Sequence, residues 1–362
     1  MEYILFLTYS CNLNCSYCFA KNLVQDNEKS SLSITRENIE LICEYIENDI
    51  KVNDRKNNSI VFFGGEPSLV PNIILDIIEK TTHLDLHYSI YTNGLLLNEL
   101  SDTLLRKFHS ILVAIDGDKE AHETYKPIGS YDKVLSNLND IRKKTNAQII
   151  GRITMEENTN IYQSVSNLLN HFDYVHWQIV NKESFDNPTE LINNYTENLQ
   201  KLFDEWKTAL QIGTVLNIIP FNRIVLSLLK NEEFDSFRCE CGYLMQAIDI
   251  YGNIYLCDEY IENPSYSLGN IRDDKFNMTS YKSHYDLFED CSKCDISSIC
   301  LGRCRKSLET QSLNQIRIYC ALTKVLVNMI LQSMEEIRQI ISEQKVDIAR
   351  LHTEFYDTEI IP

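Results

Sequence analysis

The first half of the chain alternates short apolar segments with stretches whose apolar residues recur at helical spacing. Six segments have the length and composition of buried strands: 3–8, 59–63, 86–91, 110–115, 148–154 and 173–180. The helical stretches between them are 34–50, 71–81, 95–108, 131–144 and 160–171. Strands that alternate with helices form a parallel sheet, and right-handed crossovers curl such a sheet toward a barrel. The pattern predicts a partial (β/α)6 TIM-like barrel over residues 1–185.

The second half of the chain does not continue this alternation. Residues 186–235 are polar and mostly helical, which predicts a bridge, and residues 236–325 are irregular and rich in cysteine. Within them, Gly252-Asn253 separates two strand-like runs and predicts a hairpin over 246–257. An amphipathic pattern over 321–347 predicts a helix, so residues 326–362 are expected to be a C-terminal helix and tail. The predicted fold class is α/β, with a partial barrel, a cysteine-rich domain and a C-terminal helix.

Charge and the N-terminal residues exclude several classes of function. The chain has 34 Lys and Arg against 52 Asp and Glu, a formal net charge of −18. Nucleic acids and anionic membranes both require a positive surface, so we expect neither as a partner. Residues 1–10 carry an acid rather than a basic segment, and their apolar run is too short for a signal peptide, which indicates a buried strand. We therefore expect a cytoplasmic protein, in which clustered cysteines indicate metal or redox chemistry rather than disulfides.

Three cysteines stand close together after the first predicted strand. Cys11, Cys15 and Cys18 form a C-x3-C-x2-C set. Thiolate ligands select iron–sulfur clusters or zinc, and three on one loop can hold three corners of a four-iron cluster and leave the fourth iron open. A zinc site needs four ligands, and the candidates for a fourth are distant in sequence. The spacing favours a cluster, with zinc and buried thiols as the alternatives.

Glycines and polar residues follow the next predicted strands. Gly64-Gly65-Glu66-Pro67, Thr92-Asn93-Gly94 and Ile115-Asp116-Gly117 come after the second, third and fourth strand. Paired glycines let a backbone approach a ligand, and a carboxylate suits an ammonium group. Ligands of parallel sheets bind at the carboxyl ends of the strands, where all these residues are expected. Arg152, on the fifth strand, is either a cation for such a ligand or part of a surface salt bridge.

Together these elements resemble the radical S-adenosylmethionine (SAM) enzymes, over about residues 1–185. Tyr17 is the aromatic residue of the C-x3-C-x-aromatic-C signature. The resemblance implies a 4Fe-4S cluster on the three cysteines and binding of S-adenosyl-L-methionine. The residues that it implies in binding this cofactor are Tyr17, Gly64, Gly65, Glu66, Thr92, Asn93, Asp116 and Arg152. Two positions depart from the family: Ala114 stands where Ser is frequent, and Lys126 follows His122 where Arg is frequent.

The later cysteines resemble the SPASM extension of this family, which binds two auxiliary iron–sulfur clusters. The matching elements are Cys239-Glu-Cys241, Gly252-x4-Cys257, Cys291-x2-Cys294-x5-Cys300-x3-Cys304 and Cys320. By analogy, the outer auxiliary cluster is held by Cys291, Cys294, Cys300 and Cys320. The inner auxiliary cluster is held by Cys257, Cys304 and one or both of Cys239 and Cys241. Three 4Fe-4S clusters are thus implied, Cys43 is expected in the core, and a zinc-ribbon-like structural module is the alternative.

The resemblance also implies a reaction. Enzymes of this family cleave SAM reductively to a 5′-deoxyadenosyl radical that takes hydrogen from the substrate. Members with the SPASM extension mostly modify peptides or proteins, so we expect a peptide or protein substrate, with ribosomal peptide maturation first. An electron donor such as ferredoxin or flavodoxin is also expected. The chain begins at the first barrel strand, which leaves no room for a leader-binding domain and predicts a short local motif or a separate leader-peptide recognition protein.

One pair of residues favours a second reaction. Cys257-Asp258 resembles the anaerobic sulfatase-maturating enzymes, which convert Cys or Ser to formylglycine. Asp258 is then the catalytic base that deprotonates the target residue, whereas the structural alternative is that Asp258 only caps the cluster loop. A small-molecule oxidase of cofactor biosynthesis is a further alternative. So is a non-catalytic iron–sulfur electron carrier or sensor, which would not cleave SAM.

Overall fold

The computed structural model describes residues 1–26, 28–233, 237–261, 263–273, 288–352 and 361–362. Its contacts divide the chain into two compact units. Unit 1 comprises residues 1–114, 122–149 and 240–281, and unit 2 comprises residues 115–121, 150–239 and 282–362. In the part of the chain that the structure describes, no helix has both the length and the apolar character needed to cross a membrane.

Unit 1 is built on a sheet whose longest strands are parallel. The order is β4-β3-β2-β1-β7-β8-β9, in which β8 and β9 are antiparallel to their neighbours. The strands are β1 (Glu2–Phe6), β2 (Asn58–Phe63), β3 (Leu86–Thr92), β4 (Ser110–Ala114), β7 (Met245–Ile248), β8 (Asn253–Tyr255) and β9 (Gly269–Asn270). The four residues Tyr3–Phe6 of β1 are all buried. Burial of consecutive residues is typical of a parallel strand that is covered on both faces.

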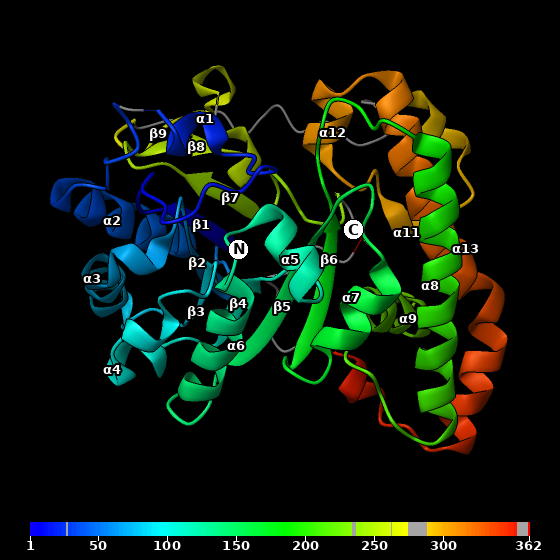
Figure 1. Ribbon diagram of the computed structural model, residues 1–362. Helices are drawn as coiled ribbons and strands as arrows, with labels where there is room; N and C mark the ends of the chain where they lie inside the picture. The colour runs from blue at the N-terminus through cyan, green and yellow to red at the C-terminus, as the bar shows by residue number, and fades with distance from the viewer. Residues whose placement is uncertain (27, 234–236, 262, 274–287, 353–360) are drawn as a thin grey trace. The chain divides into compact units, whose positions relative to one another are not determined.

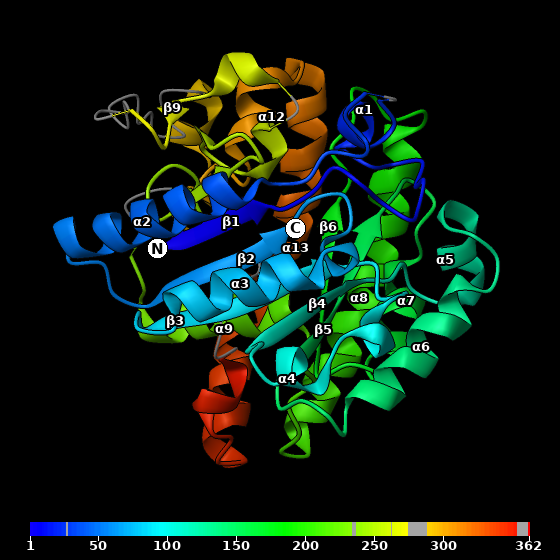
Figure 2. The same cartoon turned by 90° about the vertical axis from the view of Figure 1, so that its left-hand side faces the viewer.

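Helices cover this sheet and place its loops. Figure 2 shows α2 (Arg36–Val52) and α3 (Pro71–Thr81) lying side by side along it. Helix α2 begins after Thr35, whose side chain accepts a hydrogen bond from the Asn38 amide at 3.2 Å, as N-cap residues do. The shorter helical elements are α1 (Lys21–Val24), η1 (Pro67–Leu69), η2 (Leu97–Glu99), α4 (Asp102–Leu105), α6 (Ser130–Ile141), η3 (Asp258–Tyr260) and η4 (Pro264–Tyr266). Helix α5 (Lys119–Tyr125) has residues in both units.

Unit 2 combines a parallel strand pair with long helices. β5 (Gln148–Met155) pairs with β6 (Tyr174–Ile179) from Ile150 onward. Figure 1 shows α8 (Pro188–Gln211) and α13 (Leu313–Glu343) running alongside each other, and the two helices are in contact. Its other elements are α7 (Ile161–Leu168), α9 (Ile219–Lys230), η6 (Glu289–Lys293), α11 (Ser297–Cys300), α12 (Arg305–Thr310) and η7 (Ile348–Leu351). Trp206 and Phe221 pack at a ring distance of 5.8 Å in its core.

The predicted α/β class is confirmed, and all six predicted strands are present. The hairpin over 246–257 is also present, with Gly252 at φ +84° in its turn. Two helix predictions were wrong in extent. The stretch 95–108 forms η2 and α4 rather than one helix, since the Ser101 side chain accepts from the Leu104 amide and starts a new helix. The C-terminal helix begins at Leu313, because Ser312 caps it, so Cys320 lies inside α13.

Candidate active site

The loop after β1 carries the first three cysteines, all within unit 1. Cys11, Cys15 and Cys18 are half-buried free thiols. The Leu13 amide donates to Cys11 Sγ at 3.4 Å, and the Cys18 amide donates to the Cys15 carbonyl at 3.3 Å, so the loop turns tightly. Burial raises the pKa of the Cys11 thiol to about 12. A buried thiol of this kind becomes a thiolate near neutral pH only when a metal centre binds it.

The glycine pair after β2 lies directly against the backbone that leads into this loop. A β-carbon on Gly64, at φ +142°, would stand 2.4 Å from the Thr8 carbonyl oxygen. On Gly65 it would stand 2.2 Å from the Ser10 carbonyl oxygen. The Gly65 amide donates to Thr8 at 2.8 Å and the Glu66 amide to Ser10 at 2.7 Å. The two glycines therefore permit a close backbone contact that fixes the cysteine loop relative to β2.

This contact leads to a testable expectation. Gly65→Ala should destabilise the protein by about 2 kcal/mol or more, because the methyl group has only backbone to displace. It should also lower the iron bound by the Cys11–Cys18 loop after anaerobic reconstitution. Gly213→Ala is the control for iron binding, since at φ +75° it strains the backbone but its β-carbon would meet nothing within 4 Å. The measurements are thermal unfolding and iron content, and an equal iron loss in both variants would contradict this interpretation.

Glu66 is buried, with 1% of its surface exposed, and its carboxylate joins the ends of β2 and β3. Oε1 accepts hydrogen bonds from the Ser68 amide (3.0 Å), the Ser68 hydroxyl (2.5 Å) and the Thr92 hydroxyl (2.7 Å). Oε2 accepts from the Asn93 amide at 2.8 Å. Burial raises the pKa of Glu66, and these donors oppose the rise. Oε1 accepts three hydrogen bonds and Oε2 only this one among the described residues, so Oε2 keeps a position for an ammonium donor.

The residues after β3 connect Glu66 to the cysteine loop. Asn93 Nδ2 donates to Asn12 Oδ1 at 2.7 Å, and Asn12 directly follows Cys11. Thr92 Oγ1 also accepts from the Gly94 amide at 3.0 Å, which holds the turn after the strand. Unit 1 thus brings together Cys11, the glycine pair, Glu66, Thr92 and Asn93, all expected from the sequence at one edge of the sheet.

Tyr17, between Cys15 and Cys18, is held from outside the loop. Lys126 Nζ donates to the Tyr17 hydroxyl and lies 5.1 Å from the centroid of its ring. The Tyr125 ring packs against it with a centroid distance of 5.5 Å. Lys126 is buried. The Lys at this position, where the family frequently has Arg, therefore contacts the aromatic residue of the cysteine loop.

Asp116 and Arg152 belong to unit 2. Asp116 is buried, and its Oδ1 accepts from the Thr154 amide at 3.0 Å near the end of β5. Gly117 follows at φ +81°, and a β-carbon there would stand 2.3 Å from Ser164 Oγ. Arg152 is half-buried in β5, three residues before the strand ends, and its register partner in β6 is His176. Asp116 therefore stands beside the end of β5, and Arg152 stands inside this strand.

The middle cysteines are divided between the units. Cys241 and Cys257 belong to unit 1, and Cys239 and Cys304 belong to unit 2. Cys241 is buried, and its Sγ donates to the carbonyl of Leu256, the residue before Cys257, at 3.6 Å. Cys241 thus lies beside the segment of Cys257. Asp258 is half-buried and starts η3 directly after Cys257.

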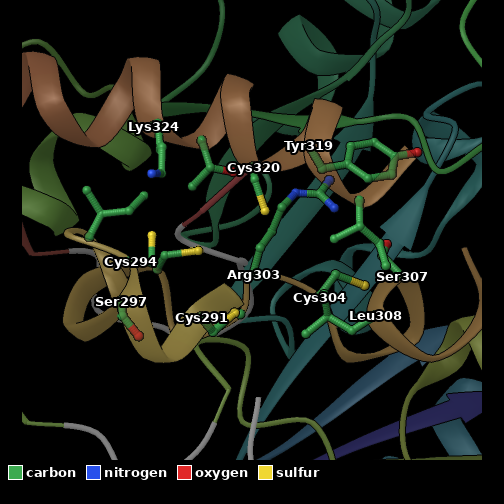
Figure 3. A pocket seen from close by; sticks show the side chains of 15 residues that line it. Cys291, Cys294, Ser297, Arg303, Cys304, Ser307, Leu308, Tyr319, Cys320 and Lys324 are labelled. Atoms are coloured by element: carbon green, nitrogen blue, oxygen red, sulfur yellow. The ribbon is translucent and has the colours of Figure 1, made fainter. Parts of the chain in front are cut away.

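The last five cysteines line one cavity in unit 2, which we call the thiol pocket. It has an empty space of about 500 Å³, and its cysteines are Cys291, Cys294, Cys300, Cys304 and Cys320. Figure 3 shows the labelled cysteine side chains converging on the space between α13 and the turns of residues 291–304. The pocket also contains Arg303, Tyr319 and Lys324. The four cysteines expected to hold the outer auxiliary cluster are therefore brought together by the fold.

The thiol pocket fits an iron–sulfur cluster by its donor set. Burial is the main cause that raises the pKa of Cys291 to about 11 and that of Cys300 to about 12, and the neighbouring thiols add to both shifts. Among the described side chains, no group of three or more His, Cys, Asp or Glu is placed to hold a single metal ion. In a four-iron cluster each thiolate binds a different iron, so its sulfurs stand farther apart than around one ion. The all-cysteine donor set of the pocket is one that a four-iron cluster takes.

Sequence patterns missed several residues of these sites. Ser68 and Asn12 hold Glu66 and Asn93, and Arg303 stands among the thiols of the pocket. Ser68 follows Glu66 by two residues, a spacing at which short side chains often hydrogen-bond, and this could have identified it. The contacts of Asn12 and Arg303 depend on the folded chain.

Comparison with known proteins agrees with this geometry. Residues 5–159 match the radical SAM superfamily. The cysteine-type anaerobic sulfatase-maturating enzyme of Clostridium novyi is 26% identical over 83% of this chain and 86% of that protein. The radical SAM cyclopropyl synthase TigE of Paramaledivibacter caminithermalis is 25% identical over 94% of this chain and 76% of that protein.

A solved structure shares the fold. It is that of native anSMEcpe with bound AdoMet and the Cp18Cys peptide, and it is 21% identical to this chain. The similarity covers 94% of this chain and 99% of that one, with a TM-score of 0.74. The shared fold therefore extends beyond residues 5–159 into the cysteine-rich second half.

Proposed function

We propose that this chain, which belongs to the radical SAM superfamily and carries a SPASM extension, is an enzyme that modifies a peptide or protein after its synthesis. The observation that carries the proposal is the arrangement in unit 1. There a loop with three thiols is joined by direct contacts to the glycine pair, to Glu66 and to Asn93. A structural metal module would not need a buried carboxylate with an open acceptor position beside its thiols.

The residues of unit 1 have separate roles in this proposal. Cys11, Cys15 and Cys18 hold the first 4Fe-4S cluster and leave one iron for SAM. Glu66 Oε2 accepts from the ammonium group of SAM, and Thr92 and Asn93 hold the carboxylate for that contact. Tyr17 completes the cofactor site within unit 1, and a role of Asp116 and Arg152 of unit 2 in binding SAM stays a sequence-based prediction. When bound, this cluster and SAM supply an oxidant that can take hydrogen from an unreactive C–H bond.

The proposal also includes two auxiliary iron–sulfur clusters. The thiol pocket holds the outer auxiliary cluster through the four cysteines named above. Cys257 and Cys304 hold the inner auxiliary cluster, with Cys241 favoured over Cys239 because Cys241 contacts the segment of Cys257. An electron donor such as ferredoxin or flavodoxin supplies the first cluster. Oxygen-sensitive thiolate sites of this kind require a reducing compartment, so we also propose a cytoplasmic location.

The substrate class rests on the relatives. The anSMEcpe structure contains a bound peptide, and most of this chain shares its fold. We therefore propose a peptide or protein substrate, with a ribosomally made peptide as the first candidate. The acidic chain, at −18, steers basic or neutral segments more readily than acidic ones. A separate leader-recognition protein would bring such a peptide to the enzyme.

Sulfatase maturation is a second candidate with its own support. Asp258 follows Cys257 at the position expected for the base, and a sulfatase-maturating enzyme aligns with 83% of this chain. In this reaction a Cys thiol and water give an aldehyde and hydrogen sulfide, with loss of two hydrogens. One hydrogen atom would leave the β-carbon for the oxidant that SAM supplies, and the thiol proton would go to Asp258, which must reach it within hydrogen-bond distance. The second electron would go to one of the proposed auxiliary clusters.

The test uses the full chain, reconstituted anaerobically with iron and sulfide. With SAM and dithionite, we expect 5′-deoxyadenosine by liquid chromatography. A protein with all its iron that forms none would instead be an electron carrier or sensor. Peptides that carry Cys, Ser or Ala at one position then separate the two substrate classes by mass spectrometry. Exchange of sulfur for oxygen together with the loss of two hydrogens, in the Cys peptide and not in the Ala peptide, indicates formylglycine, whereas other mass changes indicate a different peptide modification.

A further inference from the structure

Arg303 stands in the thiol pocket, and no Asp or Glu side chain among the described residues pairs with it. It lies between Cys300 and Cys304 in sequence, 7% of its surface is exposed, and it lines the pocket together with five cysteines. In Figure 3 its side chain passes between Cys320 and Cys304, and its guanidinium lies next to Tyr319. Lys324, the other cation that lines the pocket, pairs with Asp295 at 3.1 Å. Arg303 forms no ion pair with any side chain in the described ranges.

The guanidinium is held by two backbone oxygens and an aromatic ring. Nε donates to the backbone oxygen of Pro362, the last residue of the sequence, at 2.6 Å, and Nη2 donates to the Ile179 carbonyl at 3.2 Å. The guanidinium carbon lies 4.6 Å from the centroid of the Tyr319 ring, and Tyr319 is fixed by a hydrogen bond to the Val180 carbonyl at 3.0 Å. The two hydrogen bonds use Nε and Nη2 of the guanidinium. Nη1 is buried and has no hydrogen-bond partner within the described residues.

The backbone at Arg303 adds to the cost of this placement. Its φ is +56°, in the left-handed region, which strains any residue other than glycine. A buried guanidinium whose Nη1 is unpaired among the described residues also loses hydration without a replacement hydrogen bond. A neutral residue would avoid the loss of hydration, and glycine would avoid the backbone strain. Such a combination at one position indicates that the side chain serves a bound group.

The chemistry of the pocket identifies that group. Arg303 lines this pocket together with five cysteine side chains, and cysteines bind iron–sulfur clusters as negatively charged thiolates. A 4Fe-4S cluster with four thiolates carries net negative charge and presents sulfur atoms that accept N–H hydrogen bonds, and both properties set its reduction potential.

We infer that Arg303 raises the reduction potential of the outer auxiliary cluster, by placing a fixed positive charge beside it and by donating an Nη1 hydrogen bond to one of its sulfurs. This inference rests on the proposed function, because it requires that cluster. Reduction adds one electron to the cluster and no proton to Arg303, which stays protonated throughout. A higher potential makes the cluster a better acceptor for the electron that a substrate radical releases. Arg303 is therefore a positioning residue and does not contact the reacting atoms.

The test is a potentiometric titration of the reconstituted full-length protein, followed by electron paramagnetic resonance. The signal of the outer auxiliary cluster is assigned by its loss in Cys291→Ser. In Arg303→Gln we expect at least a tenfold lower ratio of reduced to oxidised cluster at a fixed potential, which is a shift of about 59 mV for one electron. The signals of the other clusters should not move. Arg303→Lys keeps the charge without the forked donor, so its shift should be smaller.

Arg317→Gln is the matched control. Arg317 lies on α13 one turn before Cys320, but its side chain is 63% exposed and pairs with Asp290 at 3.7 Å. Removing this charge should leave the potential unchanged, because solvent screens it. A potential unchanged in Arg303→Gln with full iron content would overturn the inference. If that variant loses its iron, Arg303→Lys decides, and an unchanged potential there would overturn it too. A wild type without a signal that depends on Cys291 would refute the proposed cluster instead.

Discussion

Cys15→Ala should abolish the formation of 5′-deoxyadenosine. Cys15 is the middle thiol of the loop after β1, and its carbonyl closes the turn by accepting from the Cys18 amide. Without its sulfur only two thiols, those of Cys11 and Cys18, remain on the loop. Two thiolates cannot hold the four-iron cluster that three thiolates hold, so SAM loses its binding site and its electron source. The measurement is 5′-deoxyadenosine by liquid chromatography after incubation with SAM and dithionite.

The control for this prediction is Cys43→Ala. Cys43 is buried on α2 and is the one cysteine expected to bind no iron. Burial raises the pKa of its thiol to about 12, as expected for a small core residue. Cys43→Ala should retain 5′-deoxyadenosine formation and all its iron, whereas Cys15→Ala should lose about a third of the iron, since three similar clusters are proposed. Normal SAM cleavage in Cys15→Ala would refute the assignment of the first cluster.

The sequence predicted the sheet well because its strands are buried on both faces. Segments such as 60–63 are apolar without interruption, and this pattern is typical of a parallel strand that is buried on both faces. The helix over 95–108 was predicted poorly, since a single hydrogen bond from the Leu104 amide to Ser101 divides it. The start of α13 depends in the same way on Ser312. Local caps of this kind contribute about 1 kcal/mol, which is too small to change the apolar pattern.

The site was predictable where backbone geometry requires a particular residue. A β-carbon on Gly65 would stand 2.2 Å from the Ser10 carbonyl oxygen, so only glycine fits there. The Gly-Gly pair in the sequence therefore already indicated a close backbone contact. Arg303 was not predictable, because nothing in the C-x5-C-x3-C spacing says where an intervening side chain points. Its guanidinium donates to the carbonyl of Ile179, which lies 124 residues earlier in the chain, and stands over the ring of Tyr319. Its Nη1 is unpaired among the described residues. Such contacts require the folded chain.

Asp258 distinguishes chemistry on the substrate from cleavage of SAM. Asp258→Asn keeps the shape of the side chain and removes its basicity, so 5′-deoxyadenosine should still form. The modified product should fall by about 100-fold or more, since a general base contributes about that factor. Glu259→Gln is the matched control, because Glu259 is the next residue of the same 3-10 helix η3. It should leave the yield of product unchanged.

The alternative role of Asp258 gives a different pattern of results. If Asp258 only caps the loop that starts at Cys257, then Asp258→Asn should lose iron from the inner auxiliary cluster, and product loss should follow that iron. Asp258→Glu separates the two roles further, because it keeps a carboxylate base but lengthens the side chain. As a base, Glu should restore part of the product with full iron content. Full product yield in Asp258→Asn would remove Asp258 from the reaction, and the base would then have to be sought elsewhere.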